Sequence, residues 1–234
     1  MTDISIPALD GTGTFGGYMA EPDSVGQVPG LILIQEIFGV NKVMRDWCNL
    51  FAKQGFLAVC PDLFWRQKPG IQLTDHTQEE WKQAIAYMNS FNLDKGIEDL
   101  KSTLSWLRQQ PRCTGKVGTV GFCLGGKLAV LMSTRTDTDV SVSYYGVGLE
   151  DYVGEYGSIT KPLMLHVAEL DTYATPELRA KYDPAFRANP HVQYHLYPGV
   201  SHAFARQGGE NYNAEAARLA NNRTSTFLHH HLKG

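Results

Sequence analysis

Apolar residues along this chain fall into two alternating patterns. Short, nearly continuous apolar runs, which are typical of buried strands, occupy residues 28–35, 56–60, 116–122, 139–145, 162–168 and 192–197. Longer segments with apolar residues at helical spacing lie between them, at residues 41–54, 77–91, 94–110, 124–134, 176–188 and 211–230. This alternation predicts an α/β fold with a mostly parallel sheet that is flanked by helices on both faces.

Glycines near the N-terminus predict turns. No helix directly follows residues 11–13 or 16–17, and a phosphate-binding glycine loop requires one. We therefore expect hairpin turns between two early strands at these glycines. The sequence contains no internal repeat, low-complexity tract or linker, so we expect one domain over residues 1–234.

Composition narrows the class of protein. The 234 residues are 43% hydrophobic and 19% charged, with a formal net charge of −3. Such a chain can form its own core, and it lacks the basic surplus of a nucleic-acid-binding protein. Its longest apolar runs fall far short of the ~20 residues that span a membrane, and no signal peptide is visible. The four cysteines lack Cys-x-x-Cys spacing, so we expect reduced thiols in a cytoplasmic protein.

The sharpest chemical signal is the segment Gly121-Phe-Cys123-Leu-Gly125. It joins a predicted strand to a predicted helix, which is where the nucleophile elbow of hydrolases occurs. The glycines permit the tight turn, and the helix N-terminus favours the thiolate form of Cys123. The Leu124 N–H is expected to form half of an oxyanion hole. The alternative is a glycine-rich turn around a buried packing cysteine.

Two further residues with catalytic side chains follow predicted strands. Asp171 comes after the strand 162–168, and His202 comes after the strand 192–197. The carboxyl ends of parallel strands share one edge of a sheet, so both side chains can reach the edge that carries Cys123. The chain order of nucleophile, acid and histidine is that of the α/β-hydrolases. We therefore predict a catalytic triad of Cys123, His202 and Asp171.

Five segments make the chain resemble the dienelactone hydrolase family of α/β-hydrolases. They are residues 35–41 (Gln-Glu-Ile-Phe-Gly-Val-Asn), 60–63 (Cys-Pro-Asp-Leu), 118–126, 144–148 (Tyr-Tyr-Gly-Val-Gly) and 202–206 (His-Ala-Phe-Ala-Arg). The resemblance implies hydrolysis of a lactone or activated ester through the predicted triad. The best-known activity of the family is the opening of dienelactone to maleylacetate in aromatic compound catabolism.

The resemblance also marks residues outside the triad. Glu36 is an expected site acid that helps to control formation of the Cys123 thiolate, and the Ile37 N–H is expected to complete the oxyanion hole. Arg206 is the expected anchor of a substrate carboxylate, because a guanidinium binds carboxylate through two hydrogen bonds. The alternatives are a salt-bridged surface glutamate and a surface arginine.

The chain departs from the family pattern at Trp81. The best-known members have a second arginine at this position for the same carboxylate, whereas an indole can only stack on a conjugated substrate. The departure favours a weaker or broader preference than dienelactone alone. Phe38, Trp65, Tyr145 and Phe204 are further candidates for the pocket wall, although each could equally belong to the core.

The remaining candidate groups have simpler interpretations. His166 lies in an apolar strand and is expected to be a hydrogen-bonded core residue. Cys48 and Cys60 are expected to be packing residues, while Cys113 is expected near a loop and exposed. The histidines at 229–231 are neighbours near a helix end, so they are not expected to converge on one metal ion.

The expected reaction is attack of Cys123 on a carbonyl carbon, followed by hydrolysis of the acyl-cysteine by water that His202 activates. It requires neither a metal nor an organic cofactor. We expect a monomer that acts on a small carboxylated lactone or ester, without nucleic acid or membrane. Two alternatives stay open: a broader small-acyl carboxylesterase or thioesterase, and a non-catalytic thiol sensor or ligand-binding protein.

Overall fold

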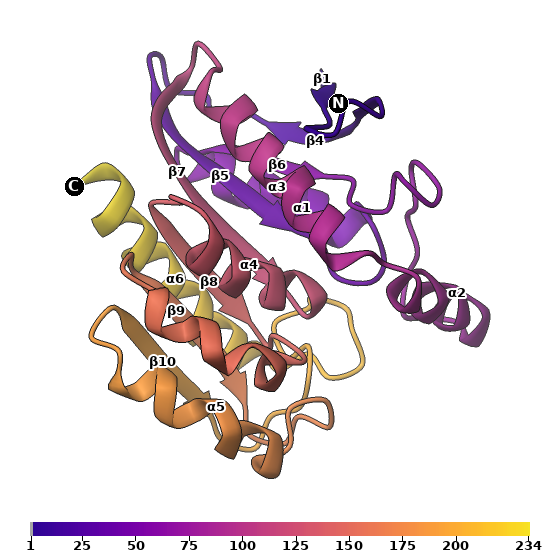
Figure 1. The fold of residues 1–234 in the computed structure, drawn as a ribbon, viewed down its shortest axis with the longest axis vertical. Coiled ribbons are helices and arrows are strands. Elements are labelled where there is room, and N and C mark those ends of the chain that lie inside the picture. Colours follow the sequence, from indigo (N-terminus) through magenta and orange to yellow (C-terminus); the bar gives the residue numbers. More distant parts are fainter. Residues whose placement is uncertain (1) are drawn as a thin grey trace. The chain divides into compact units, whose positions relative to one another are not determined.

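A computed structural model describes residues 2–234 of the chain (Figure 1). The chain forms two compact units, which meet in sequence between Gly118 and Thr119. Strand β7 (Cys113–Phe122) crosses this point of the sequence. The expectation of one domain over residues 1–234 stays a prediction.

The first unit contains neighbouring strands in the order β1, β4, β6, β5. β5 and β6 are parallel, whereas β4 is antiparallel to both β6 and β1. Their bounds are β1 (Thr2–Asp3), β4 (Gly17–Ala20), β5 (Val28–Ile34) and β6 (Leu57–Pro61). The helices are α1 (Lys42–Lys53), α2 (Gln78–Asn89) and α3 (Leu93–Arg108). α1 and α3 both pack on β5 and β6 but hardly touch each other, so they cover opposite faces.

A small antiparallel pair, β2 (Ile6–Pro7) and β3 (Thr14–Phe15), lies between β1 and β4 in the sequence. It confirms the hairpin predicted around the first glycines. The second predicted turn is wrong, because Gly17 is the first residue of β4. A Cβ atom at Gly17 would lie 2.4 Å from the Cys60 carbonyl oxygen, so glycine is required there by close packing of the strands rather than by a turn.

The second unit contains neighbouring strands in the order β7, β8, β9, β10. β8 is parallel to β9, and β9 is parallel to β10. The bounds are β8 (Val140–Tyr144), β9 (Leu163–Ala168) and β10 (Val192–Tyr197). The helices are α4 (Leu124–Arg135), the 3₁₀ segment η1 (Leu149–Ser158), α5 (Pro176–Ala188) and α6 (Ala214–Lys233). η1 packs on both α4 and α5, whereas α6 packs on β8 from the other face of the strands (Figure 1).

Helix starts follow from local side-chain chemistry. Five of the α-helices in the described chain begin at a residue whose side-chain oxygen accepts a hydrogen bond from the first turn: Asn41, Thr77, Asn92, Thr175 and Asn213. The sixth, α4, begins at Cys123, which provides no such bond. This helix N-terminus therefore keeps its donors for another acceptor.

The strands and helices agree with the sequence pattern to within about three residues at their ends, with two informative differences. η1 was not predicted, although its apolar residues Leu149, Tyr152, Val153 and Tyr156 do repeat at helical spacing. β7 begins at Cys113 rather than at residue 116. As a result, Cys113 is buried in a strand, and the expectation that it lies exposed near a loop is wrong.

The core of the second unit lies beneath η1 and α5. In this core Tyr156 stacks on Phe186, with ring centroids 4.1 Å apart. Cys48 and Cys60 are buried packing residues of the first unit, as predicted, and all four cysteines are free thiols. No helix within residues 2–234 has the length and apolar character needed to cross a membrane.

Candidate active site

Cys123 stands alone in the turn between β7 and α4. Its backbone has φ 57° and ψ −114°, a conformation that side-chain-bearing residues rarely adopt. A Cβ atom at Gly121 would lie 1.8 Å from the Gly125 carbonyl oxygen, and one at Gly126 would lie 2.6 Å from the Tyr144 carbonyl oxygen. Glycine at these positions therefore lets the chain close the turn and place the thiol at the helix N-terminus, as the elbow motif predicts.

The start of α4 provides a favourable environment for negative charge. The first backbone hydrogen bond of the helix runs from the Lys127 N–H to the Cys123 carbonyl oxygen, at 3.2 Å. The Leu124 N–H lies ahead of this bonded turn, where helix N–H groups lack partners within the helix. These unpaired N–H groups and the partial positive charge of the helix end are available to an oxyanion beside Cys123.

His202 and Asp171 meet although they come from different loops. Asp171 follows β9 and His202 follows β10, and the Asp171 Oδ2 atom accepts a hydrogen bond from His202 Nδ1 at 2.8 Å. The other carboxylate oxygen, Oδ1, accepts a bond from the Tyr173 N–H at 2.9 Å. Asp171 is 3% exposed and His202 is 6% exposed, so solvent screens the pair weakly.

The loops that carry this pair are tied to each other through their backbones. The Glu169 N–H donates to the Tyr197 carbonyl oxygen at 3.0 Å, and the Leu170 N–H donates to the Val200 carbonyl oxygen at 2.9 Å. These bonds extend the pairing of β9 with β10 beyond the strand ends. They fix the distance between the acid and the histidine, which lie 31 residues apart in the sequence.

His202 also interacts with the thiol of Cys123. Nε2 is buried and has no aligned hydrogen bond within residues 2–234, but His202 interacts electrostatically with Cys123. Burial lowers the pKa of the imidazole, while the negative charge of Cys123 and the bond to Asp171 raise it more strongly, to a net pKa of about 10. The His202 imidazole is therefore protonated at neutral pH. Catalytic hydrogen bonds are often poorly aligned before substrate binds.

Two tyrosines enclose the His202 ring. Tyr145 and Tyr173 present their rings at steep angles to it, with centroid distances of 5.1 and 4.9 Å. Tyr145 also packs against Phe204, at 5.6 Å. Tyr145, a candidate for the pocket wall that could equally belong to the core, lies against His202. Tyr173 was missed, although its position two residues after Asp171 was a signal for it.

Backbone strain in the described chain is concentrated around these groups. Its non-glycine residues with positive φ are Cys123, Tyr145 and Ala203, at 57°, 38° and 63°. Each is either a predicted site residue or the neighbour of one. Strained backbone of this kind costs roughly 1–3 kcal/mol per residue and is concentrated at functional sites in proteins.

Arg206 belongs to the same loop as His202. Its backbone N–H donates to the Ala203 carbonyl oxygen at 2.9 Å, which closes a turn directly after the histidine. Arg206 is 6% exposed, so it is not a surface arginine. A buried guanidinium close in sequence to His202 fits the predicted role of anchoring a carboxylate.

The remaining predicted residues lie in the first unit. Glu36, Ile37 and Phe38 directly follow β5 and are all buried. The loop that follows these residues requires glycine at position 39. Gly39 has φ 75°, and a Cβ atom there would lie 2.0 Å from the Ile71 carbonyl oxygen. The roles of Glu36 as an acid and of the Ile37 N–H as an oxyanion donor stay predictions.

Trp81 and Phe38, both predicted to line the pocket, touch each other. Their rings meet edge to face with centroids 5.2 Å apart. The Trp81 indole N–H donates to the Asp75 carbonyl oxygen at 3.0 Å, so this donor is already engaged. Trp65, by contrast, stacks on Phe15 and therefore serves the packing of the first unit.

Comparison with solved structures identifies the fold. The crystal structure of a "Putative Dienelactone Hydrolase" from Klebsiella pneumoniae subsp. pneumoniae MGH 78578 matches with a TM-score of 0.84 at 24% sequence identity, covering 97% of this chain and 97% of that one. The protein is therefore an α/β-hydrolase, and the predicted mostly parallel sheet with helices on both faces is confirmed.

Comparison of sequences identifies the family. The model of the Dienelactone hydrolase family matches residues 15–232. An Azospirillum brasilense protein named "Putative carboxymethylenebutenolidase" is 52% identical over 242 residues, covering 99% of this chain and 100% of the relative. The carboxymethylenebutenolidase of Pseudomonas putida is 39% identical over 225 residues, covering 96% and 94%. The chain belongs to the dienelactone hydrolase family, and it is a carboxylic ester hydrolase.

Proposed function

We propose that this enzyme opens dienelactone-type lactones, or closely related activated esters, through an acyl-cysteine formed on Cys123. The observation that carries the proposal is the position of His202, which binds Asp171 through Nδ1 and also interacts with Cys123. This is the arrangement that nucleophile, base and orienting acid require. The names of the Azospirillum and Pseudomonas relatives support a carboxymethylenebutenolidase substrate.

In the first half of the reaction the Cys123 thiolate attacks the lactone carbonyl carbon and forms a C–S bond. The Leu124 N–H at the start of α4 stabilises the negative oxygen of the tetrahedral intermediate. The ring C–O bond then breaks. The departing enolate oxygen takes the proton of the His202 imidazolium, which leaves the imidazole neutral and able to act as a base.

In the second half His202 acts as a base. It removes a proton from water, which attacks the acyl carbon, and the C–S bond breaks to return the Cys123 thiolate. Asp171 holds the imidazole in one orientation and stabilises its charged form throughout. A vinylogous enolate is a good leaving group, so the cysteine suffices for lactones and activated esters, whereas amides react far more slowly.

Arg206 is the residue from which we infer the substrate preference of the enzyme. Arg206 is buried close in sequence to His202, and its planar guanidinium can bind a substrate carboxylate through two hydrogen bonds. Trp81 contributes no second cation to such a ligand. The expected substrate is therefore a carboxylated lactone held through one arginine, with aromatic walls that also accept other conjugated esters.

The decisive experiment combines mass spectrometry with two variants. Rapid acid quenching during turnover of dienelactone should trap a mass increase on the peptide that contains Cys123, and Cys123→Ala should abolish both the adduct and turnover. Arg206→Gln should raise the KM for dienelactone by about 10- to 100-fold, the effect of losing a charge-assisted bond, while turnover of a neutral aryl ester changes little.

Three results would each redirect the assignment. Turnover of neutral esters that exceeds that of dienelactone and is unaffected by Arg206→Gln would indicate a broader carboxylesterase. Oxidised forms of Cys123 without turnover of any ester would indicate a thiol sensor. Full turnover by Cys123→Ala would refute the cysteine mechanism.

A further inference from the structure

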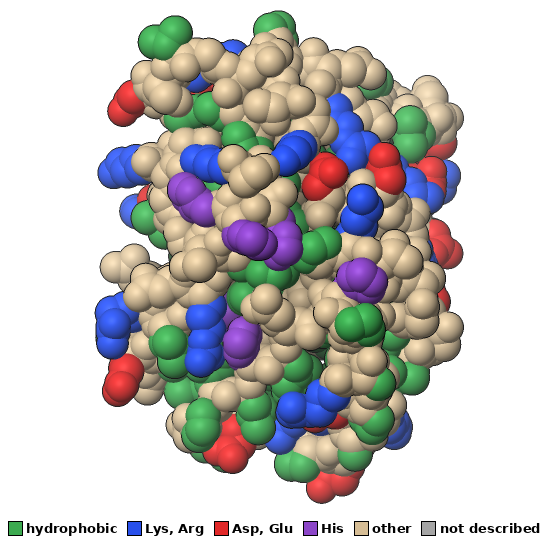
Figure 2. Space-filling view, turned by 90° about the vertical axis from the view of Figure 1, so that its left-hand side faces the viewer, with side chains coloured by type: hydrophobic (Ala, Val, Ile, Leu, Met, Phe, Trp, Pro, Cys, Tyr) green, Lys and Arg blue, Asp and Glu red, His purple; other side chains and the backbone are tan. Residues whose placement is uncertain are grey.

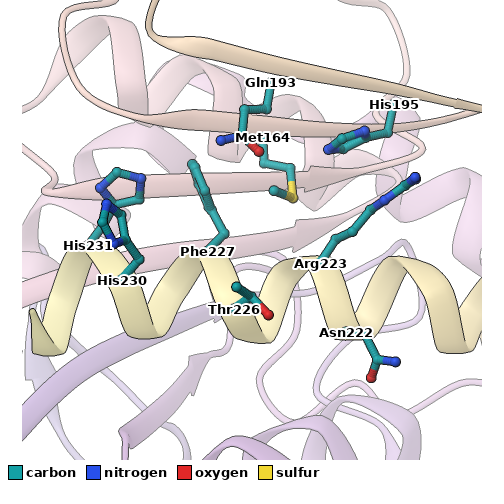
Figure 3. Close-up of a pocket in the computed structure, with 9 residues that line it drawn as sticks. All are labelled: Met164, Gln193, His195, Asn222, Arg223, Thr226, Phe227, His230 and His231. Atoms are coloured by element: carbon teal, nitrogen blue, oxygen red, sulfur yellow. The ribbon is translucent and has the colours of Figure 1, made fainter.

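A cavity lies in the second unit, between α6 and the strands β9 and β10 (Figure 3). It has a volume of about 400 Å³, within the range of small-molecule sites. None of its lining residues belongs to the candidate active site. They are Met164, Gln193, His195, Asn222, Arg223, Thr226, Phe227, His230 and His231.

Strand register and helix periodicity build this cavity. Met164 pairs with Gln193, and His166 pairs with His195, so these neighbouring pairs point to the same face of β9 and β10. α6 lies opposite and contributes residues four apart, Arg223 and Phe227 among them. The side chains of Met164 and Phe227 occupy the middle, Arg223 and His195 lie together at one end, and His230 and His231 lie at the other (Figure 3).

Positive charge is not neutralised at the Arg223 end. The Arg223 guanidinium donates to the Tyr197 hydroxyl at 3.1 Å and lies over the Tyr197 ring, but it forms no ion pair within residues 2–234. No acidic residue lines the cavity. On the face shown in Figure 2, histidine side chains gather with Lys and Arg side chains close by. A guanidinium has five N–H donors, so most of them remain available to an acceptor from solution.

His195 supplies a second unused polar atom. Its Nε2 is buried and has no hydrogen-bond partner in the described part of the chain. Its ring stacks at 5.8 Å on that of His166, both of whose nitrogens are already bonded to hydroxyl groups of the protein. Burial and the adjacent Arg223 lower the pKa of His195, so it is a neutral donor beside a permanent cation. Buried polar atoms without partners are rare, and a ligand explains this one.

We propose that this cavity binds a small organic monocarboxylate. The carboxylate accepts hydrogen bonds from Arg223 and from His195 Nε2–H, and the apolar body of the ligand packs between Met164 and Phe227. An inorganic anion would satisfy the first contact and leave the apolar middle unfilled. The chemistry of the lining thus selects an amphipathic acid, of which benzoate is a simple probe.

Nuclear magnetic resonance of the full chain labelled with ¹⁵N-histidine tests the proposal at the site itself. The His195 imidazole signal, identified by its disappearance in His195→Gln, should shift saturably with sodium benzoate, with a dissociation constant of about 1 mM or tighter. Because the reporter is local, benzoate bound near Arg206 in the active site does not imitate the effect.

Two variants and two further anions sharpen the test. Arg223→Gln should weaken benzoate binding at least about tenfold, since it removes a charge-assisted pair, whereas Arg218→Gln, an exposed residue on the same helix, should not. Arg223→Lys, which keeps the charge without the fork, serves if the glutamine variant does not fold. Acetate and sulfate should both bind more weakly than benzoate.

Three results would overturn the proposal. One is a His195 shift that stays linear with benzoate concentration, which indicates no site. Another is equal benzoate affinity in folded Arg223 variants and in Arg218→Gln. The third is sulfate or acetate binding as tightly as benzoate, which would remove the role of Met164 and Phe227.

Discussion

Arg179 holds the loop that presents Asp171 to His202. Its Nη1 atom, at the end of a side chain from α5, donates to three backbone carbonyl oxygens at 3.2, 3.0 and 2.7 Å, those of Ala168, Glu169 and Ala174. These carbonyls lie on both sides of Asp171 in the sequence. The buried cation therefore fixes both ends of the loop, while β10 fixes the position of the histidine.

Replacing Arg179 with lysine should impair catalysis more than folding. All three bonds come from the Nη1 atom, and the lysine side chain is one bond shorter, so its ammonium would fall short of the position from which one nitrogen serves three carbonyls. We expect kcat/KM to fall about tenfold or more and the free energy of unfolding to fall by about 1–3 kcal/mol. Rates should be compared well below the melting temperature. The matched control is Arg187→Lys, an exposed residue of α5, and an equal loss of activity there would contradict the assignment.

Activity should persist to unusually alkaline pH. The pKa of His202 is raised from 6.5 to about 10, so its imidazolium stays protonated through the neutral range and loses its proton only as pH rises through about 10. Turnover of esters with poor leaving groups, which need that proton, should fall around this pH. Turnover of nitrophenyl esters, whose leaving groups need none, should fall less.

Asp171→Asn provides the control for this pH profile. The variant removes one of the interactions that raise the pKa of His202, so the alkaline loss should move to lower pH. A wild-type profile that already declines near pH 6.5–7, the ordinary range of histidine, would contradict the raised pKa of His202.

Gly121 should not tolerate alanine. The added Cβ atom would lie 1.8 Å from the Gly125 carbonyl oxygen, which belongs to backbone and cannot move without opening the turn. We expect a loss of about 3 kcal/mol or more in unfolding free energy, at the upper end of overpacking effects, together with loss of turnover. Gly154→Ala is the comparison, because nothing lies within 4 Å of a Cβ atom there. Similar melting temperatures for both variants would refute this account.

His166 should make the protein less stable in mild acid. Burial lowers the pKa of His166 well below 6.5, so as pH falls below 6.5 the unfolded chain takes up a proton that the folded chain excludes. The free energy of unfolding therefore decreases over that range. His166→Gln removes this titration, and its stability should depend less on pH in urea unfolding between pH 7 and 5. His191→Gln, an exposed residue, should retain the wild-type pH dependence.

The residues that could be predicted from sequence share one property: local pattern and chain order determine their positions. Cys123 is placed by flanking glycines, and Asp171 and His202 by the strands that precede them. The carboxyl ends of parallel strands lie at one edge of a sheet. The proximity of three segments that are distant in the sequence could therefore be predicted from the sequence. The bond between His202 and Asp171 confirms that reasoning in geometry, while the catalytic roles await the experiments above.

The features that could not be predicted depend on contacts between distant side chains and backbone. Arg179 donates hydrogen bonds to backbone carbonyl oxygens. Every residue type has such an oxygen, so the sequence does not show which ones Arg179 contacts. The cavity beside α6 depends on the register that pairs Met164 with Gln193, and one residue of slip would turn both side chains to the other face. Cys113 was wrongly predicted to be exposed near a loop. The exposed Thr114 and Lys116 of β7 have the polar character that is typical of a loop.

At the turn that contains Cys123, the requirements of the backbone are independent of the identity of the reactive atom. The backbone geometry of the turn requires glycine at positions 121 and 126, but it does not require a sulfur atom at position 123. A serine would fit the same bend, so an oxygen nucleophile could replace the thiol without any redesign of the surrounding chain. The nucleophilic side chain can therefore be exchanged, in evolution or by protein engineering, while the backbone turn that positions it is unchanged.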